Sequence, residues 1–470
     1  MKLRPSVLLL YIPFILVVMA MMTACDASLW LVPGGDSTTK APTEQTALET
    51  TSGGSTAIET TSDNPETETG SSESTGTTKT GSTASAPGST TSSAKKTTTT
   101  TATYPKPDTG KEMRAAWVSC FELDDLIVKK TVNEAKAVID DIMINCKAYG
   151  LNAVIFHARS HSNAYYKSTV FNSATSVKNL ISSGFDPLEY AVNAAHSRGL
   201  ELHAWVNPYR IGSDKSFAKC NDYFKSDSNY FYNPASNDAQ KLIVSGVEEI
   251  VKNYNVDGIH FDDYFYPTDL SNLSNDKFYN DYKSKGGTMS VADWRRDNVS
   301  KLIKAVYSKV HSIKSGCVFG VSPRGVQSQN FGTVYADVGL WMSKKGYVDY
   351  VCPQVYFGFK HKTQAFGKNV DSWIEMPRHS SVRLFIGLGL YKIGMYNDSN
   401  AISEEGKKEW ATNDDIMKSS LLYVRSKPEC GGVMFFSYSF FKPLLKPDSS
   451  SWSKDIARRE VENLLSVMKP

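Results

Sequence analysis

The chain has 470 residues, of which 41% are hydrophobic and 21% are charged, so it is long enough for a large domain with a buried core. Its formal net charge is only +3 and no basic stripe stands out, so a nucleic acid is not expected as a partner. No Gly-rich phosphate loop follows an early strand-like run, and no Cys or His spacing typical of zinc occurs. Neither a cofactor nor a metal is therefore expected.

The first 24 residues have the pattern of an export signal. Lys2 and Arg4 precede an apolar run over residues 7–22 that is interrupted only by Pro13. This run is short for a permanent membrane span, which needs roughly 20 apolar residues. We therefore expect residues 1–24 to be a signal peptide that is cleaved.

Cys25 directly follows the small residues Thr23 and Ala24, and this segment resembles a bacterial lipobox, in which the cysteine is acylated and becomes the new N-terminus. The resemblance implies lipidation at Cys25 and a membrane partner through the N-terminal lipid anchor. The expected location is the outer face of the cell membrane, within the cell envelope.

A long polar segment follows this cysteine. From Asp36 to about Thr103 the chain consists almost entirely of Ser, Thr, Gly, Ala and Pro, which supply too little apolar surface for folding. We predict that residues 25–110 are a lipidated cysteine with a disordered linker. About 70 such residues span roughly 45 Å as a flexible coil, which suits a tether.

Residues 111–470 alternate between strand-like and helix-like patterns. The strand candidates are the eight runs 114–120, 153–159, 202–207, 258–264, 318–323, 347–356, 384–391 and 432–438. Amphipathic helical patterns lie between them, for example over residues 132–149, 187–197 and 238–254. This alternation predicts one α/β domain, a (β/α)8 TIM barrel with long loops on its catalytic face. An open doubly wound sheet is the alternative, which the missing phosphate loop disfavours.

Polar residues gather at the ends of several of these runs. Period-two alternation places His157 with Arg159, His203 with Trp205 and Asn207, and His260 with Asp262 on one face of each run. A face turned toward the surrounding helices should be apolar, so these side chains are assigned to the barrel interior and mouth. Active sites of TIM barrels lie at this end of the strands.

Other cysteines and histidines have a structural interpretation. Cys317 and Cys352 lie in or beside strand-like runs and are expected to be buried thiols. His157, His161 and His203 raise the possibility of a metal site, but no carboxylate or cysteine lies at a recognised spacing from them. They are therefore interpreted as interior histidines.

Three separated segments carry a family resemblance. They are residues 114–118 (RAAWV), 204–210 (AWVNPYR) and 257–267 (DGIHFDDYFYP). Together they resemble the glycosyl-hydrolase-like 10 family over about residues 111–438. The resemblance implies a barrel protein, common among bacterial lipoproteins, that cleaves peptidoglycan strands stripped of their peptides. It supplies no catalytic assignment, so the site residues are predicted from their own chemistry.

Asp262 and Asp263 are the catalytic candidates. Glycoside hydrolysis needs a carboxylic acid to protonate the leaving oxygen and a second group to attack or stabilise the anomeric carbon. Two adjacent acids near Arg159 and Arg324 would titrate as a coupled pair with separated pKa values, as acid/base catalysis requires. The structural alternative is that both aspartates only hold a loop in place.

The segment around these acids is similar to the chitinase signature DGxDxDxE, with two departures. His260 replaces an aspartate, and Tyr264 stands where the catalytic glutamate would be. A substrate-assisted route stays open, in which the N-acetyl group of the sugar attacks and one of the two aspartates is the acid. In that route Gln354 and Tyr356 would hold the acetamido group.

The remaining candidates are predicted to bind the sugar by stacking or by hydrogen bonds. The predicted substrate-binding residues are Arg159, Trp205, Asn207, Tyr209, Arg210, Tyr264, Arg324, Gln354 and Tyr356. Tyr266 and Tyr391 are further stacking candidates, although barrel aromatics are often core residues. Residues 211–237 and 268–291 are expected to form the walls of the cleft or a subdomain.

The sequence therefore predicts a glycosidase whose partner is a polysaccharide, with cell-wall glycan as the expected substrate. A non-catalytic glycan-binding barrel is one alternative, supported by the altered signature. A glycosidase of another extracellular polysaccharide, such as a capsule polymer, is the other.

Overall fold

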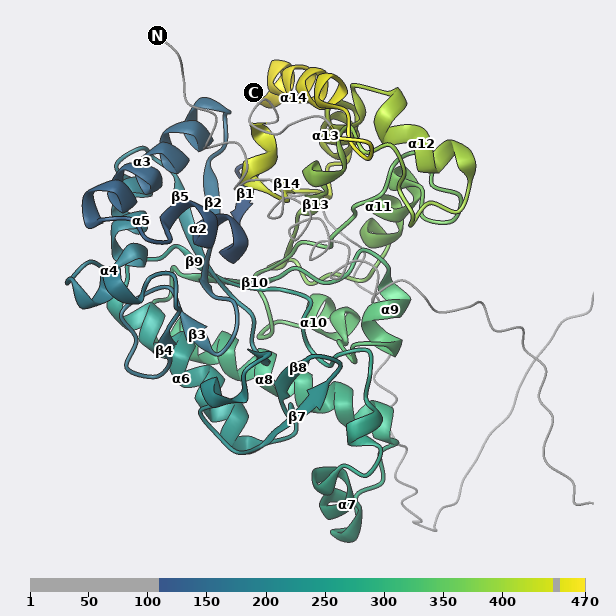
Figure 1. The fold of residues 1–470 in the computed structure, drawn as a ribbon. Helices are drawn as coiled ribbons and strands as arrows, with labels where there is room; N and C mark the ends of the chain where they lie inside the picture. The colour runs from purple at the N-terminus through teal and green to yellow at the C-terminus, as the bar shows by residue number, and fades with distance from the viewer. Residues whose placement is uncertain (1–109, 443–448, 470) are drawn as a thin grey trace, which may run out of the picture. The chain divides into compact units, whose positions relative to one another are not determined.

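The computed structural model describes residues 110–442 and 449–469. The predicted signal peptide, the lipidation of Cys25 and nearly all of the predicted linker lie outside the described residues. In the described part, Figure 1 shows strands at the centre and helices around them. No helix within these two ranges is both long and apolar enough to cross a bilayer.

The central sheet consists of parallel strands. In spatial order they are β12 (Arg383–Leu384), β11 (Tyr350–Val351), β10 (Val318–Val321), β9 (Gly258–Phe261), β5 (Glu201–Val206), β2 (Ala153–Arg159), β1 (Met113–Val118), β14 (Gly432–Phe435) and β13 (Ile386–Leu388). The sequence order is thus followed around the sheet, as expected for a barrel of βα units.

Residues 383–388 join the two ends of this sheet. β12 pairs with β11, β13 pairs with β14, and only Phe385 separates β12 from β13. The backbone N–H of Phe385 donates to the carbonyl of Val351 at 2.9 Å. The nine strands therefore occupy eight positions of a barrel, and the predicted (β/α)8 fold is confirmed.

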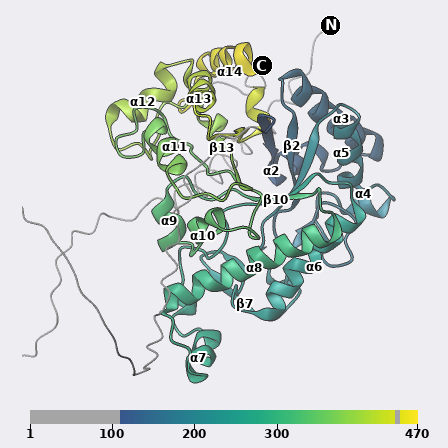
Figure 2. The same ribbon diagram turned by 180° about the vertical axis from the view of Figure 1, so that it is seen from behind.

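Helices connect the strands and cover the outside of the barrel, as both views show (Figures 1 and 2). Polar caps start them: Thr131 and Glu134 form a capping box at the first long helix, and Asp186 and Ser236 cap the next two. Among these helices are α3 (Val132–Ala148), α5 (Pro187–His196), α6 (Asn237–Asn253), α8 (Val291–Ile313), α11 (Phe366–Ile374), α13 (Ile416–Arg425) and α14 (Lys454–Met468). The others are α2 (Cys120–Ile127), α4 (Lys178–Ser182), α7 (Lys277–Ser284), α9 (Gln327–Gly332), α10 (Val338–Ser343) and α12 (Glu404–Thr412).

The predicted runs match the strands in place but not always in length. The second run, 153–159, coincides with β2. The sixth, 347–356, is shortened to β11, because Pro353 lacks the N–H that a longer strand would need. Cys317 and Cys352 are buried, as predicted.

The barrel interior contains a chain of hydrogen bonds. The hydroxyl of Tyr350 lies 3.0 Å from Nδ1 of His203 and 2.9 Å from Nδ1 of His260. The indole of Trp117 donates to Nε2 of His260 at 3.1 Å, so His260 carries its proton on Nδ1 and donates it to Tyr350. Burial lowers the pKa of His260 well below its usual range. Both histidines are thus interior residues that bond to Tyr350.

We expect Gly320→Ala to destabilise the barrel by about 2 kcal/mol, the typical cost of overpacking. Gly320 pairs with His260 across β10 and β9, and a Cβ there would overlap the ring of Tyr350. Urea unfolding followed by circular dichroism measures the loss. Gly316→Ala is the control, because a Cβ at that position meets no heavy atom within 4 Å. Equal stability of the two variants would contradict the prediction.

Two long connections follow strands at the carboxyl end of the barrel. Residues 211–237 contain most of an antiparallel sheet in the order β6 (Arg210–Gly212), β8 (Asn229–Tyr232) and β7 (Tyr223–Ser226). Residues 268–291 contain α7, which lies at the lower edge of Figure 1 beyond α8. A two-residue pair, β3 (Asn163–Ala164) with β4 (Asn172–Ser173), follows β2. The predicted long loops are therefore folded segments.

Glu122 joins the loops that follow the first and the last strand of the barrel. Its Oε2 accepts from the backbone N–H of Ser119 at 2.7 Å in a capping box that starts α2. Its Oε1 accepts from Oγ of Ser437 at 2.8 Å and from the backbone N–H of Ser439 at 2.6 Å. One buried carboxylate thus satisfies three donors from two loops.

Glu122→Ala is expected to lower the free energy of unfolding by roughly 2–4 kcal/mol, because it leaves buried donors without an acceptor. Thermal and urea unfolding measure this loss. Glu134→Ala removes the same capping-box role at the exposed start of α3. It should lower the free energy of unfolding by less than Glu122→Ala does. A loss at Glu134 equal to that at Glu122 would show that the contacts to Ser437 and Ser439 contribute nothing.

Candidate active site

Asp262 and Asp263 follow β9 directly, at the carboxyl end of the barrel, which we call the mouth. Asp262 is only 7% exposed. Its Oδ1 accepts from Nε2 of Gln354 at 2.8 Å and from the backbone N–H of Asp263 at 2.8 Å. Both of these bonds reach the same oxygen, so Oδ2 is the atom that can carry a proton.

The environment of Asp262 favours its protonated form. Burial, followed by the charge of Asp263, raises the pKa of Asp262 well above its usual range, although the hydrogen bond from Gln354 opposes this shift. The two aspartate side chains also hydrogen-bond to each other, which raises the pKa of Asp262 further. A carboxyl that stays protonated near neutral pH is what a general acid requires.

Asp263 is held by an arginine from the next strand. Nε of Arg324 donates to Oδ2 of Asp263 at 3.2 Å, and both side chains are at most 10% exposed. Arg324, a predicted neighbour of the acids, thus contacts Asp263, and Gln354, which was predicted to hold the substrate, contacts Asp262. The mouth therefore brings a buried carboxyl with a raised pKa next to a carboxyl that is paired with a cation.

Aromatic rings at the ends of four strands gather at the mouth. Tyr356 stacks on Phe436 at 5.9 Å between ring centroids and lies edge-on to Tyr391 at 5.8 Å. Phe436 also contacts Tyr391 at 6.0 Å and Trp205 at 6.5 Å. Tyr356, Tyr391 and Phe436 are partly exposed, so this cluster offers apolar faces of the kind that sugar rings pack against.

Arg159 lies elsewhere than predicted. Its guanidinium donates to the carbonyls of His161 at 3.3 Å and Pro208 at 3.0 Å, and lies 4.5 Å from the ring centroid of Phe171. The register between β2 and β5 shifts after His157, so the alternation used for the prediction fails at Arg159. Arg159 is fully buried, and its described contacts include neither aspartate.

Tyr209 and Tyr266 are also placed differently. Both rings are almost completely buried, so they belong to the core and cannot stack on a sugar. Burial raises the pKa of Tyr209 well above its usual range. Both tyrosines are therefore core residues, and the predicted role in binding sugar is wrong for them.

Three other predicted residues lie around the mouth in local contacts. Asn207 accepts from Nε1 of Trp205 at 3.0 Å and donates to the carbonyl of Ser160 at 3.0 Å. The guanidinium of Arg210 lies 5.1 Å from the ring centroid of Tyr264. Asn207 thus orients Trp205, and the ring of Tyr264, where the chitinase signature has its glutamate, packs against a cation.

The histidines near the mouth have structural partners. The backbone N–H of Cys120 donates to Nδ1 of His157 at 3.0 Å, and the ring of His157 stacks on Trp205 at 3.7 Å. Burial lowers the pKa of His161 to about 3. Among the residues that the structure describes, no group of three or more His, Cys, Asp or Glu side chains is arranged to hold a metal.

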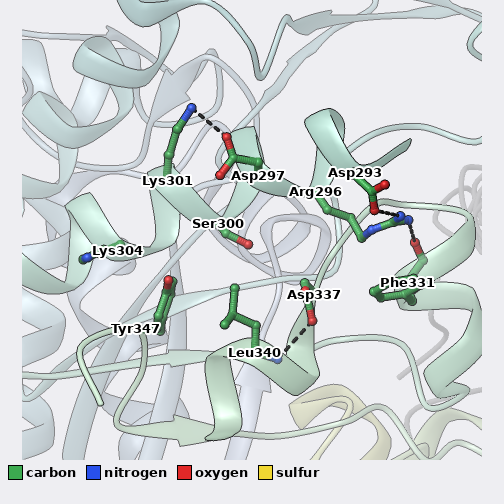
Figure 3. Close-up of a pocket in the computed structure, with 10 residues that line it drawn as sticks. All are labelled: Asp293, Arg296, Asp297, Ser300, Lys301, Lys304, Phe331, Asp337, Leu340 and Tyr347. Atoms are coloured by element: carbon green, nitrogen blue, oxygen red, sulfur yellow. Dashed lines mark hydrogen bonds and ion pairs between the residues drawn. The ribbon is translucent and has the colours of Figure 1, made fainter. Parts of the chain in front are cut away.

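A surface hollow is lined mainly by residues of α8, α9 and α10 (Figure 3). Its lining residues are Asp293, Arg296, Asp297, Ser300, Lys301, Lys304, Phe331, Asp337, Leu340 and Tyr347. Arg296 pairs with Asp293 at 2.6 Å and Lys301 with Asp297 at 2.7 Å. Because these charges neutralise each other and no acid is buried among them, the mouth is the better candidate for catalysis.

Sequence reasoning missed two contributors to the mouth. Phe436 follows β14 and joins the aromatic cluster. The run of aromatic and hydroxyl residues at the end of the last predicted strand was the feature of the sequence that could have indicated this role. Glu122 joins two loops there, and the Ser119-x-x-Glu122 pattern before an apolar run was the available sign of its capping role.

A model of the family described as glycosyl hydrolase-like 10 matches residues 112–403. Glycosyl hydrolase YngK of Bacillus subtilis is 32% identical over 320 residues, which cover 60% of this chain and 61% of that protein. Glycosyl hydrolase DigH of Escherichia coli K12 is 28% identical over 378 residues, which cover 70% of this chain and 83% of that protein. The match thus spans less than two thirds of the Bacillus subtilis protein.

Solved structures with a similar fold have low sequence identity. The PgaB (BpsB) glycoside hydrolase domain from Bordetella bronchiseptica is 13% identical with a TM-score of 0.49, over 77% of this chain and 99% of that one. An endo-1,4-beta-mannanase from Rhizomucor miehei is 10% identical with a TM-score of 0.47, over 78% of this chain and 98% of that one.

Proposed function

The chain belongs to the glycosyl hydrolase-like 10 family, and we propose that it is a glycosidase that cleaves the glycan strands of the bacterial cell wall. The observation that supports an active site at the mouth is the buried Asp262, whose pKa is raised, beside Asp263, which pairs with Arg324 at 3.2 Å. An enzyme that hydrolyses a glycosidic bond needs such a proton donor.

In the proposed reaction, Asp262 is the general acid. Its Oδ2 proton passes to the glycosidic oxygen as the bond to the anomeric carbon breaks. Oδ1 stays fixed by Gln354 and by the peptide N–H of Asp263, so the carboxyl keeps one orientation. Asp263 beside it, held by Arg324, stabilises positive charge that develops on the sugar in the transition state.

The arrangement favours substrate assistance over a protein nucleophile. Ordinary retaining and inverting enzymes place two carboxyls on either side of the scissile bond. Here the two carboxyls hydrogen-bond to each other, so they occupy one side. In the substrate-assisted route, the N-acetyl group attacks the anomeric carbon of the sugar that carries it. This route requires the N-acetylated glycan that cell walls contain.

Gln354 and Tyr356 are proposed to orient the acetamido group. The amide nitrogen of Gln354 donates to Asp262 and to the carbonyl of Ser322 at 3.2 Å, which uses both of its hydrogens. Its Oε1 therefore remains as the acceptor for an acetamido N–H. The partly exposed ring of Tyr356 lies in the aromatic cluster and supplies a face for the acetyl methyl group.

The proposed location is the outer face of the cell membrane. The sequence pattern at residues 1–24, the lipobox-like Cys25 and the Ser/Thr-rich segment together support export, lipid anchoring and a tether. A tether of roughly 45 Å would let an anchored barrel work within a wall.

The test is to incubate the purified protein with peptide-free and with peptide-bearing cell-wall glycan and to analyse released sugars by mass spectrometry. We expect muro-oligosaccharides from the peptide-free glycan. Release of sugars from a capsule polymer, and from neither wall glycan, would show that the substrate is another polysaccharide.

Tyr264 in the place of the signature glutamate favours a second candidate function, a barrel that binds glycan without cutting it. Binding without release of sugars would support that candidate.

A further inference from the structure

The segments after β10 and β11 carry the partners of the two acids. Arg324, which contacts Asp263, and Gln354, which contacts Asp262, are paired in a parallel β-bridge. The backbone N–H of Gln354 donates to the carbonyl of Pro323 at 2.9 Å. The backbone position at residues 323–325 therefore sets the hydrogen-bond partners of both aspartates.

Asn330 on α9 fixes this segment. Its side chain is almost completely buried, and its Oδ1 accepts from the backbone N–H of Arg324 at 3.0 Å. Its Nδ2 donates to the carbonyl of Arg324 at 2.8 Å and to that of Val326 at 3.3 Å. One amide thus binds both peptide groups of Arg324, which a shorter apolar side chain could not do.

The same segment has no space in which to move toward β11. Nε1 of Trp373 donates to the carbonyl of Gly325 at 2.7 Å. A Cβ added at Gly325 would overlap the carbonyl oxygen of Gln354. Asn330 and Trp373 therefore hold the segment from two sides, and Asn330 is the one bonded to Arg324 itself.

We propose that Asn330 is a positioning residue for the reaction: it acts by fixing Arg324 against the carboxylate of Asp263. Its described contacts include neither aspartate. The proposal rests on the proposed function, because it assigns Asn330 to the acid/base pair of a glycosidase. Displacing a reacting group by about 1 Å can cost on the order of 100-fold in rate.

The experiment compares Asn330→Ala with Gln327→Ala in the full chain, with peptide-free wall glycan as substrate. Gln327 lies on the same helix, but its amide donates to Ser372 on α11, away from the mouth. We expect Asn330→Ala to lower kcat by about 10- to 100-fold with little change in KM. Gln327→Ala should match the wild type.

A double-mutant cycle with Arg324→Met separates positioning from a purely structural role. If Asn330 acts through Arg324, then Asn330→Ala lowers kcat no further in the Arg324→Met background. The same fold-loss in both backgrounds, or a folded Asn330→Ala with normal kcat, would overturn the proposal. A wild type that releases no sugar overturns the proposed function and this inference with it.

Asn330→Asp is the test variant to use if Asn330→Ala does not fold. It keeps the size of the side chain, but the ionised carboxyl cannot donate to the carbonyl of Arg324. Its activity relative to the wild type should therefore rise as the pH falls and the carboxyl becomes a donor again. A ratio that is independent of pH would overturn the proposal.

Discussion

Replacing Asp262 by asparagine is expected to reduce the rate of glycan cleavage by about 10²- to 10⁴-fold, the contribution typical of a general acid. The amide is the same size as the acid and can keep its carbonyl oxygen toward Gln354 and the peptide N–H of Asp263. It cannot deliver a proton to the leaving oxygen. The loss should therefore appear in kcat, with KM and thermal stability close to those of the wild type.

Asp257→Asn is the matched control for this variant. Asp257 precedes the same strand, but at its opposite end, where Oδ2 accepts from the backbone N–H of Leu202 at 2.7 Å and pairs with His196 at 2.8 Å. Its replacement should affect stability more than turnover. Full activity of a folded Asp262→Asn variant would show that another residue is the general acid. Equal losses of kcat in both variants would show that the substitutions disturb the strand itself.

The sequence was sufficient to predict the barrel because its signals are local. Short apolar runs alternate with capped amphipathic helices, and polar residues recur at period two on the inner faces of the strands. The division of the seventh run into β12 and β13 around Phe385 was not predictable, because it depends on which neighbour each half pairs with. Pairing partners distant in sequence leave no pattern in the run itself.

In the candidate site too, local sequence patterns were predictable and contacts between residues distant in sequence were not. Asp262 and Asp263 were predicted as a pair near Arg324, and Gln354 was predicted to bind substrate at the same mouth, because each follows a strand and parallel strands end at one edge. Arg159 was misplaced because one irregularity in register turns every later side chain to the other face. The contact between Asn330 and Arg324 left no recognisable pattern, since an asparagine in a short helix usually indicates only a surface or a cap.

The opposing influences on Asp262 predict opposite shifts in the pH dependence of catalysis. The general acid must be protonated, so activity should fall as the pH rises through the elevated pKa of Asp262. The charge of Asp263 raises this pKa, so Asp263→Asn should move the basic limb of the kcat/KM profile to lower pH. The hydrogen bond from Gln354 lowers it, so Gln354→Met should move that limb to higher pH. Each shift should be about one pH unit, the size of one hydrogen bond to a charged group.

Profiles of kcat/KM are the correct measurement, because they report ionisations of the free enzyme, to which this geometry refers. Both variants should also lose activity, Asp263→Asn the more, because it removes the negative charge that stabilises the transition state. Shifts in the same direction for both variants would show that the limb belongs to a group other than Asp262. Opposite shifts would assign the proton to Asp262, since this carboxyl accepts the hydrogen bond from Gln354 and is repelled by the charge of Asp263.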